Sequence, residues 1–120
     1  MPRAGRHPRQ GELWWFDPGP FRGTELGKEV RPALIVSVDT FNSGGPKAVV
    51  VPGTTQHHDN PLHVPFSYRV NGAPVTTYFA CDNVRSIDAR ARLIRRMAPN
   101  PVPSAILDDV QRRLTLIFGL

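Results

Sequence analysis

Cysteine and long apolar runs are scarce in this chain of 120 residues, and each absence narrows what the protein can be. Cys81 is the single cysteine, so no disulfide can form within the chain, and a reducing, cytoplasmic compartment is expected. No apolar run approaches the roughly 20 residues that a membrane helix needs. The basic N-terminus is not followed by the apolar segment of a secretory signal, so we expect no membrane association.

Familiar motifs of enzyme sites are missing as well. The chain has no CxxC pair, no HExxH, no GxxxxGK phosphate loop and no GxSxG elbow. A group of side chains, His57, His58, Asp59 and His63, suggests either a metal cluster or a polar surface loop. Adjacent histidines on a loop usually point apart, so the surface loop is the preferred interpretation and no metal or cofactor is expected. Cys81 follows an apolar segment, which favours a core position over a nucleophile.

Positive charge is concentrated in two parts of the sequence, within a net charge of +5. Residues 1–10 hold three arginines and no acidic residue, and we expect them to form a flexible basic tail. Residues 11–84 hold five basic and seven acidic side chains, whereas residues 85–113 hold seven arginines and three aspartates. This distribution suits a polyanion, an acidic protein partner, or solubility alone.

Short apolar segments between turn residues predict one small, mainly β domain over residues 11–120. Strands are expected at about 11–17, 33–38, 48–52, 64–70 and 74–81, with a turn at 39–46 and a short strand or turn around 93–94. Alternating apolar residues in the fourth segment, followed by Asn71-Gly72, predict a hairpin.

A single helix is predicted over residues 103–118. Its apolar side chains recur at helical spacing and should form one face, in the core or at an interface: Ile106, Leu107, Val110, Leu114, Ile117 and Phe118. Pro103 suits the first helical position, and two aspartates precede two arginines in the order that favours two i,i+4 ion pairs. The combination predicts a small β-barrel, or an open barrel, packed by a C-terminal helix.

The stretch GELWWFDPGPFRGTELGKEVRPALIVSV, residues 11–38, carries the first indication of a site. Pro32 removes a backbone donor and biases Arg31 toward an extended conformation at the start of a strand. A guanidinium fixed beside a flexible loop suits phosphate binding. A surface salt bridge of Arg31 with Glu25 or Glu29 is the alternative. Trp14 and Trp15 should face opposite sides of their strand, one in the core and one available for stacking or for a subunit interface.

Three segments, in this order, resemble the MazF/PemK-type toxins of bacterial toxin–antitoxin pairs: GELWWFDPGPFRGTELGKEVRPALIVS, AVVVPGTTQ and CDNVRSIDARARL. The family pattern places an RP pair at the head of one strand and a P-x-T sequence at the end of another. The resemblance runs from about Gly11 to the C-terminus. It implies an SH3-like barrel with an added helix, which is also the fold of toxins that bind DNA gyrase.

This resemblance implies a sequence-specific endoribonuclease that needs no metal and cleaves single-stranded RNA by attack of the 2′-hydroxyl on the adjacent phosphate. It implies a homodimer in the bacterial cytoplasm, inhibited by an acidic antitoxin segment that competes with RNA. Arg31 and Thr54 match the catalytic positions. The implied substrate-binding residues are Glu25, Lys28, Thr55, Gln56 and Arg85.

Two other readings stay open on the sequence. One is a non-catalytic barrel that binds gyrase, which would not require the pair of Arg31 and Thr54. The other is a degenerate relative that keeps only its antitoxin contact. The arginines between residues 85 and 96 either line the RNA path or lie on a solvated surface.

Overall fold

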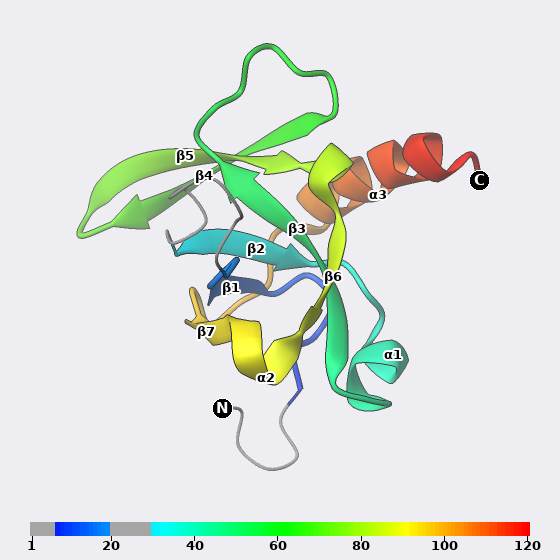
Figure 1. The fold of residues 1–120 in the computed structure, drawn as a ribbon. Helices are drawn as coiled ribbons and strands as arrows, with labels where there is room; N and C mark the ends of the chain where they lie inside the picture. Colours follow the sequence, from blue (N-terminus) through cyan, green and yellow to red (C-terminus); the bar gives the residue numbers. More distant parts are fainter. Residues whose placement is uncertain (1–6, 20–29) are drawn as a thin grey trace.

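The computed structural model describes residues 7–19 and 30–120, and a curved antiparallel β-sheet dominates them (Figure 1). The strands are β1 (Leu13–Phe16), β2 (Arg31–Ile35), β3 (Lys47–Thr54), β4 (His63–Val70), β5 (Ala73–Ala80), β6 (Arg85–Asp88) and β7 (Leu93–Arg96). They follow the order β4-β5-β3-β2-β1-β7, and β6 pairs with β3. In the described residues β4 and β7, the two ends of this path, do not pair with each other, so the sheet is curved but not closed. The expected class, mainly β with a C-terminal helix, is confirmed.

The long strand β3 organises the sheet because three strands pair with it. β2 lies along one edge, with Ile35 opposite Val50. The other edge is shared: β6 pairs with residues 47–50, and β5 pairs with Gly53 and Thr54. The chain passes from β5 to β6 through a 3-10 turn, η2 (Cys81–Asn83). The two strands therefore separate beside the last residues of β3.

Several predicted strands differ from the observed ones at their ends. β2 begins at Arg31 rather than at residue 33, and it ends at Ile35 rather than at residue 38. β3 continues past the predicted residue 52 to Thr54, because β5 supplies a partner for its last residues. The hairpin is confirmed: Asn71 and Gly72 both have positive φ, at 52° and 83°, as a type I′ turn requires.

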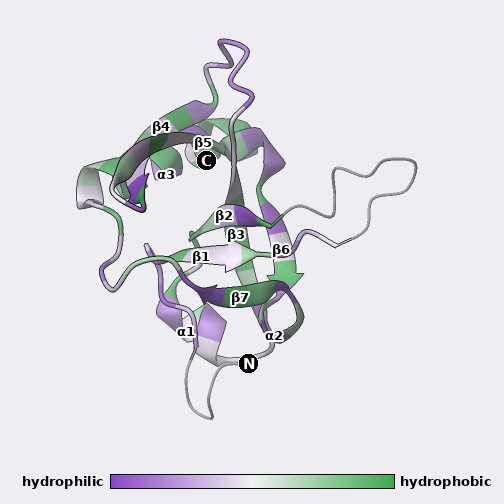
Figure 2. Cartoon of the chain, turned by 90° about the vertical axis from the view of Figure 1, so that its left-hand side faces the viewer, coloured by the Kyte–Doolittle hydropathy of each residue, from purple (hydrophilic) through white to green (hydrophobic). Residues whose placement is uncertain are grey.

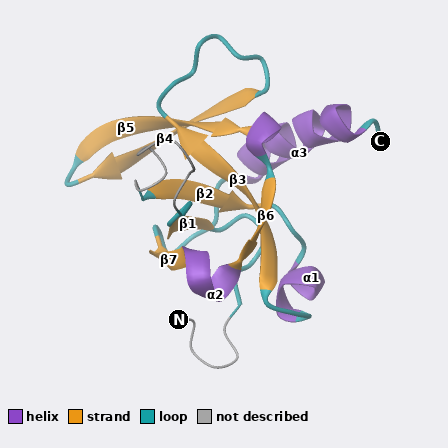
Figure 3. Cartoon of the chain, viewed as in Figure 1, coloured by secondary structure: helices purple, strands orange, loops and turns teal. Residues whose placement is uncertain are grey.

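The predicted turn at 39–46 contains a short helix, α1 (Asp39–Ser43). The buried Asn42 holds it in place, since its amide nitrogen donates to the carbonyl oxygens of Pro8 at 2.9 Å and Ser37 at 3.1 Å. A second short helix, α2 (Ala89–Arg92), is capped by Asp88, whose carboxylate accepts two backbone N–H groups. Figure 3 shows α1 and α2 at the end of the molecule away from the β3–β4 loop.

The C-terminal helix α3 (Ser104–Phe118) begins one residue after the predicted Pro103, which is its N-cap. Four of the six predicted apolar side chains pack on the sheet: Ile106, Leu107, Val110 and Leu114. Ile117 and Phe118 are exposed, at 38% and 60%. They lie where α3 projects beyond the sheet (Figure 1), so the core holds only part of the predicted face, and an interface role for the rest stays a prediction. One of the two predicted i,i+4 ion pairs is confirmed, Asp109 with Arg113 at 3.7 Å, whereas Arg112 pairs with Asp109 at i,i+3 spacing.

Side chains alternate between the two faces of the sheet, and each face has its own core. We call the first the helix-covered face; its core includes Leu34, Val51 and Phe79 of the sheet and Val110 of α3. Cys81 lies in the same core and is fully buried, as predicted. The second, here the opposite face, buries the following residues: Trp14, Phe16, Ala33, Ile35, Ala48, Val50, Ile87, Ala89 and Leu93. Trp15, the neighbour of Trp14, is half-buried and meets Tyr68 edge to face.

The segment expected as a flexible tail joins the domain earlier than residue 10. Pro8 is buried, and the backbone N–H of Gln10 donates to Asp39 Oδ1 at 2.8 Å. Arg9 forms an ion pair with the same carboxylate at 3.6 Å. These contacts fix residues 8–10, so the tail stays a prediction only for residues that lie outside the described part. In the described residues, no helix has both the length and the apolar character to cross a membrane.

Candidate active site

The register between β2 and β3 brings the two predicted catalytic side chains together. Ala33 pairs with Pro52 in the antiparallel ladder. Continuing this register by two residues places Arg31, the first residue of β2, opposite Thr54, the last residue of β3. Both side chains point to the same face of the sheet as the core residues of the opposite face. They therefore lie next to the end of that core, at the edge of the sheet.

Gly53 is required at the end of β3 because β5 approaches it closely. An added Cβ there would lie 2.3 Å from Thr77 Oγ1 and 3.4 Å from Pro32 Cβ. Thr77 is buried, so its hydroxyl cannot move aside into solvent. The glycine therefore keeps β5 paired with the last residue of β3.

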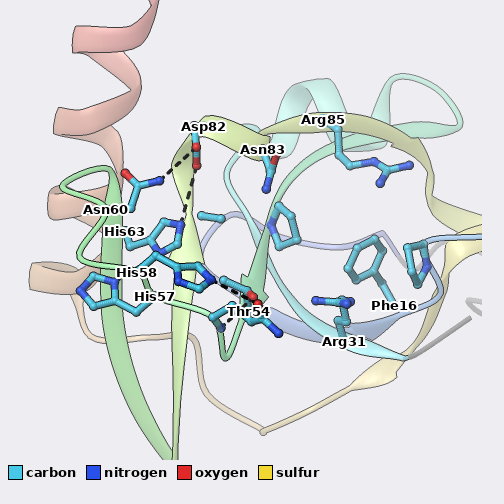
Figure 4. Close-up of a pocket in the computed structure, with 15 residues that line it drawn as sticks. Phe16, Arg31, Thr54, His57, His58, Asn60, His63, Asp82, Asn83 and Arg85 are labelled. Atoms are coloured by element: carbon cyan, nitrogen blue, oxygen red, sulfur yellow. Dashed lines mark hydrogen bonds and ion pairs between the residues drawn. The ribbon is translucent and has the colours of Figure 1, made fainter. Parts of the chain in front are cut away.

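A cavity of about 490 Å³ opens where the core of the opposite face ends (Figure 4). This volume lies in the range of small-ligand sites. The cavity is lined by residues from β1 to β6 and from the β3–β4 loop: Phe16, Pro18, Arg31, Pro52, Gly53, Thr54, Gln56, His57, His58, Asn60, His63, Ala80, Asp82, Asn83 and Arg85. In Figure 4 Thr54 lies between Arg31 on one side and the histidines on the other.

Two arginines supply the positive charge of the cavity. Arg31 comes from β2. Arg85 comes from β6, where it pairs with Val50 of β3. Both side chains belong to half-buried residues. A guanidinium offers its donors in a planar fork that matches two phosphate oxygens, so this side of the cavity suits a phosphodiester.

The other side of the cavity is a cluster of imidazoles and one carboxylate. His57 Nδ1 and His63 Nδ1 lie 3.3 Å apart, and the His57 ring stacks on Tyr78 at a centroid distance of 4.3 Å. His63 Nε2 lies 3.9 Å from Asp82 Oδ1. Asn60 Nδ2 donates to the second oxygen of Asp82 at 3.2 Å. Figure 4 shows Asp82 joined to both Asn60 and His63.

Burial is the main cause that lowers the pKa of His63. The residue is only 8% exposed. The carboxylate of Asp82 acts in the opposite direction, and the neighbouring His57 and His58 add to the lowering. The net direction favours the neutral imidazole near neutral pH.

The β3–β4 loop holds these histidines through its own hydrogen bonds. Asn60 is its centre: its N–H donates to the His57 carbonyl, its carbonyl accepts from His63 N–H, and its side chain accepts from Leu62 N–H at 2.8 Å. His58 and Asp59 both adopt a positive φ of 53°, a conformation that residues with a Cβ rarely adopt. Consecutive strained residues are typical of functional loops. Figure 2 shows this loop as a mainly hydrophilic segment above the sheet.

Comparison with known proteins identifies the fold and the family together. The family model described as "PemK-like, MazF-like toxin of type II toxin-antitoxin system" matches residues 9–118. The chain belongs to this family. "Endoribonuclease PemK" of Escherichia coli is 33% identical to it over 111 residues, which cover 91% of this chain and 80% of the relative.

Solved structures share the fold of this chain. MazF from Deinococcus radiodurans has a TM-score of 0.79 and 26% identity, over 96% of this chain and 99% of that one. A mycobacterial endoribonuclease solved in complex with its cognate antitoxin has a TM-score of 0.72 and 23% identity, over 94% and 96% of the two chains. The family and the named relative make this toxin an endoribonuclease of a type II toxin–antitoxin system.

The site of this PemK-like toxin contains some of the residues that the sequence suggested. Arg31, Thr54, Gln56 and Arg85 line one cavity. Thr55 is exposed and is not among the residues that line it. The remaining suggested residues, Glu25 and Lys28, lie outside the described residues, as does Glu29, the other proposed salt-bridge partner of Arg31.

Sequence reasoning missed the histidine side of the cavity. His57 and His63 were assigned to a surface loop, and Asp82 received no role. The position of His57 three residues after the P-x-T strand end was the available signal for that residue; Asp82 had none. The described residues contain no group of three His, Cys, Asp or Glu side chains arranged to hold a metal ion.

Proposed function

We propose that this toxin cuts single-stranded RNA at selected sequences by attack of the 2′-hydroxyl on the adjacent phosphate, without a metal ion. The observation that carries the proposal is the convergence of Arg31 and Thr54 on one open cavity of about 490 Å³. Such a reaction needs a group that stabilises the charge of a five-coordinate phosphorus and groups that move two protons.

Arg31 binds the phosphate through its guanidinium fork, and Arg85 adds a second positive charge from β6. The Thr54 hydroxyl oxygen accepts the backbone N–H of Gln56 at 3.1 Å. This bond uses a lone pair of Thr54 Oγ1, so its hydrogen can be donated to a phosphate oxygen. Gln56 lines the same cavity and contacts the substrate beside the phosphate.

Specificity for RNA follows from the chemistry, because the nucleophile is the 2′-hydroxyl that DNA lacks. Sequence selection requires contacts to the bases on either side of the cut. We assign these contacts to Gln56, Thr55 and the loop that carries Glu25 and Lys28. That loop lies outside the described residues.

We further propose that the toxin acts as a homodimer in the bacterial cytoplasm and that an acidic segment of its antitoxin inhibits it. The family description and the mycobacterial complex support an antitoxin partner. An acidic segment would compete with RNA for the positive charge of Arg31 and Arg85.

The test is cleavage of a long transcribed RNA by the purified toxin in the presence of EDTA, followed by mapping of the new 5′ ends. We expect cuts at a short common sequence, with 5′-hydroxyl and 2′,3′-cyclic phosphate ends. Arg31→Ala should lower the rate of cutting by about 10²–10³-fold. No cleavage by the wild type, equal cleavage by Arg31→Ala, or 5′-phosphate ends would contradict the proposal. Loss of intact messenger RNA in expressing cells, instead of broken DNA, separates it from gyrase binding.

A further inference from the structure

The proposed reaction lacks a proton acceptor if Arg31 and Thr54 act alone. A guanidinium keeps its proton in proteins and is a poor base, and a threonine hydroxyl is a weak one. The 2′-hydroxyl must nevertheless lose a proton as it attacks phosphorus. The histidine side of the cavity supplies the side chain best suited to this exchange near neutral pH. This inference rests on the proposed function and adds residues to the same site.

His57 lies close to the reacting phosphate that Thr54 would hold. Thr54 pairs with Tyr78 across the β3–β5 ladder, so the two side chains lie on the same face. The His57 ring stacks on the Tyr78 ring, with centroids 4.3 Å apart and planes 6° apart. Tyr78 therefore links His57 to Thr54, and both His57 and Thr54 line the cavity.

The contacts of the cluster also select which ring nitrogen carries hydrogen. Asp82 Oδ1 lies 3.9 Å from His63 Nε2, which favours hydrogen on that nitrogen. His63 Nδ1 is then a lone-pair acceptor, and the 3.3 Å contact requires His57 Nδ1 to donate. A neutral His57 with hydrogen on Nδ1 has its lone pair on Nε2. We propose that His57 Nε2 accepts the 2′-hydroxyl proton during cleavage, with His63 as the positioning residue that fixes its tautomer.

Burial of His63 supports this arrangement, because it lowers the pKa of His63 and keeps the ring neutral, as an acceptor at Nδ1 must be. His58 is a weaker choice for the base: it is exposed, and its Nε2 lies 3.2 Å from the amide oxygen of Gln56, which favours hydrogen there. The titratable groups that line the cavity with His57 or contact its ring are His58, His63, Tyr78, Asp82, Arg31 and Arg85.

The O2′–P bond forms while the 2′-hydroxyl proton passes to His57 Nε2, which becomes an imidazolium. The P–O5′ bond breaks, and the leaving 5′-oxygen takes a proton from water. His57 then returns its proton to solvent, which restores the neutral ring. The products are a 2′,3′-cyclic phosphate and a 5′-hydroxyl.

Single-turnover cleavage of a short oligonucleotide that spans a mapped site tests the inference from about pH 5 to about pH 9. We expect the wild-type rate to fall on the acid side, because an imidazolium cannot accept the 2′-hydroxyl proton. His57→Gln should lower the rate at neutral pH by about 10²–10⁴-fold and remove the acid limb. His7→Gln, the matched change at an exposed histidine outside the cavity, should keep both.

Further measurements separate a chemical role from a structural one. His57→Ala should regain part of its rate when free imidazole is added. His63→Gln should retain an acid limb with a moved midpoint, as expected of a positioning residue. A substrate with sulfur in place of the 5′-oxygen needs no acid for its leaving group, so it should not rescue His57→Gln. Thermal melting checks that each variant is folded.

A His57→Gln rate within about threefold of wild type, an unchanged acid limb, or rescue by the sulfur substrate would overturn the assignment of His57 as the base. If the wild type cuts RNA in EDTA and Arg31→Ala does not, these results leave the proposed function intact. An inactive wild type would instead remove the proposed function itself.

Discussion

The two faces of the sheet use the same strands for different purposes. On the helix-covered face, Leu34 and Val51 meet Val110 of α3, and all three are fully buried. On the opposite face, the core ends at Phe16, and the row continues into the open cavity with Arg31 and Thr54. Alternation along β2 and β3 thus directs one set of side chains to packing and the next set to chemistry.

This difference teaches that coverage by a helix, more than residue composition, decides whether a face of the sheet serves stability or function. A helix covers one face, so substitutions there should change the free energy of unfolding and leave the cavity intact. No helix covers the end of the opposite face within the described residues, so substitutions there should change cleavage with little effect on unfolding. The following predictions, from the largest expected effect to the smallest, are ways to break or sharpen this comparison.

Removing the large ring on the helix-covered face should have the largest effect on stability. Phe79 is fully buried among Leu34, Val51 and Val64, so Phe79→Ala leaves a cavity and should lower the free energy of unfolding by about 3–5 kcal/mol. Urea unfolding measures this loss. The folded fraction should keep its cleavage rate per molecule, and a loss of rate without a loss of stability would break the comparison.

Arg31→Ala should have the opposite effect: it should lower the cleavage rate and leave stability unchanged. Loss of a preorganised donor to the reacting phosphate should lower the cleavage rate by about 10²–10³-fold, while the melting temperature stays near that of wild type. Arg112→Ala removes an arginine from the exposed surface of α3 and is the matched control, with wild-type cleavage expected. A drop in melting temperature for Arg31→Ala as large as that for Phe79→Ala would contradict the separation of the two faces.

Thr54→Val keeps the shape of the side chain and removes one hydrogen bond to the phosphate. A bond to a charged group contributes about 1.5–3 kcal/mol, so the rate should fall by about 10–100-fold. Thr76→Val provides the control, because Thr76 is exposed on β5 and its hydroxyl contacts Ser67 at 3.0 Å. Equal rates for the two variants would show that the Thr54 hydroxyl has no part in cleavage.

His63 contributes to both packing and chemistry, since it is buried and lines the cavity. Its pKa is lowered in the folded state from 6.5, so the unfolded chain takes up a proton first as the pH falls through about 6.5. The free energy of unfolding should therefore decrease on acidification, by at most about 1.4 kcal/mol per pH unit from this residue. Urea unfolding at several pH values should show a shallower decrease in His63→Gln than in His7→Gln. Equal slopes would refute the assignment.

Cys81 provides the simplest test of the helix-covered face, and its expected effect is the smallest. Burial raises the pKa of its thiol to about 11, so the reactive thiolate is rare at neutral pH. A thiol reagent added to the native protein at neutral pH should react slowly, and it should react at once after denaturation. Rapid labelling of the native protein would show that the helix-covered face opens.

Local patterns predicted those elements whose partners are close in the sequence. The alternation at residues 64–70 with Asn71-Gly72 specified the β4–β5 hairpin, and the spacing of Ile106, Val110 and Leu114 specified α3 and its packed side. The same spacing did not show that Ile117 and Phe118 are exposed, because periodicity does not show where the sheet beneath a helix ends. Turn formers at 39–46 concealed α1, which depends on contacts of Asn42 with Pro8 and Ser37.

The sequence by itself determined β1 to β5, the helix α3, the buried Cys81 and, through three motifs in register, the family and the candidates Arg31 and Thr54. Only the tertiary structure decided that Arg31, Thr54 and Arg85 line one cavity and that His57 and His63 meet across the loop beside Asp82. The reason is that local sequence fixes backbone preference and side-chain alternation. The meeting of distant side chains depends on strand order, on register and on where β5 separates from β6.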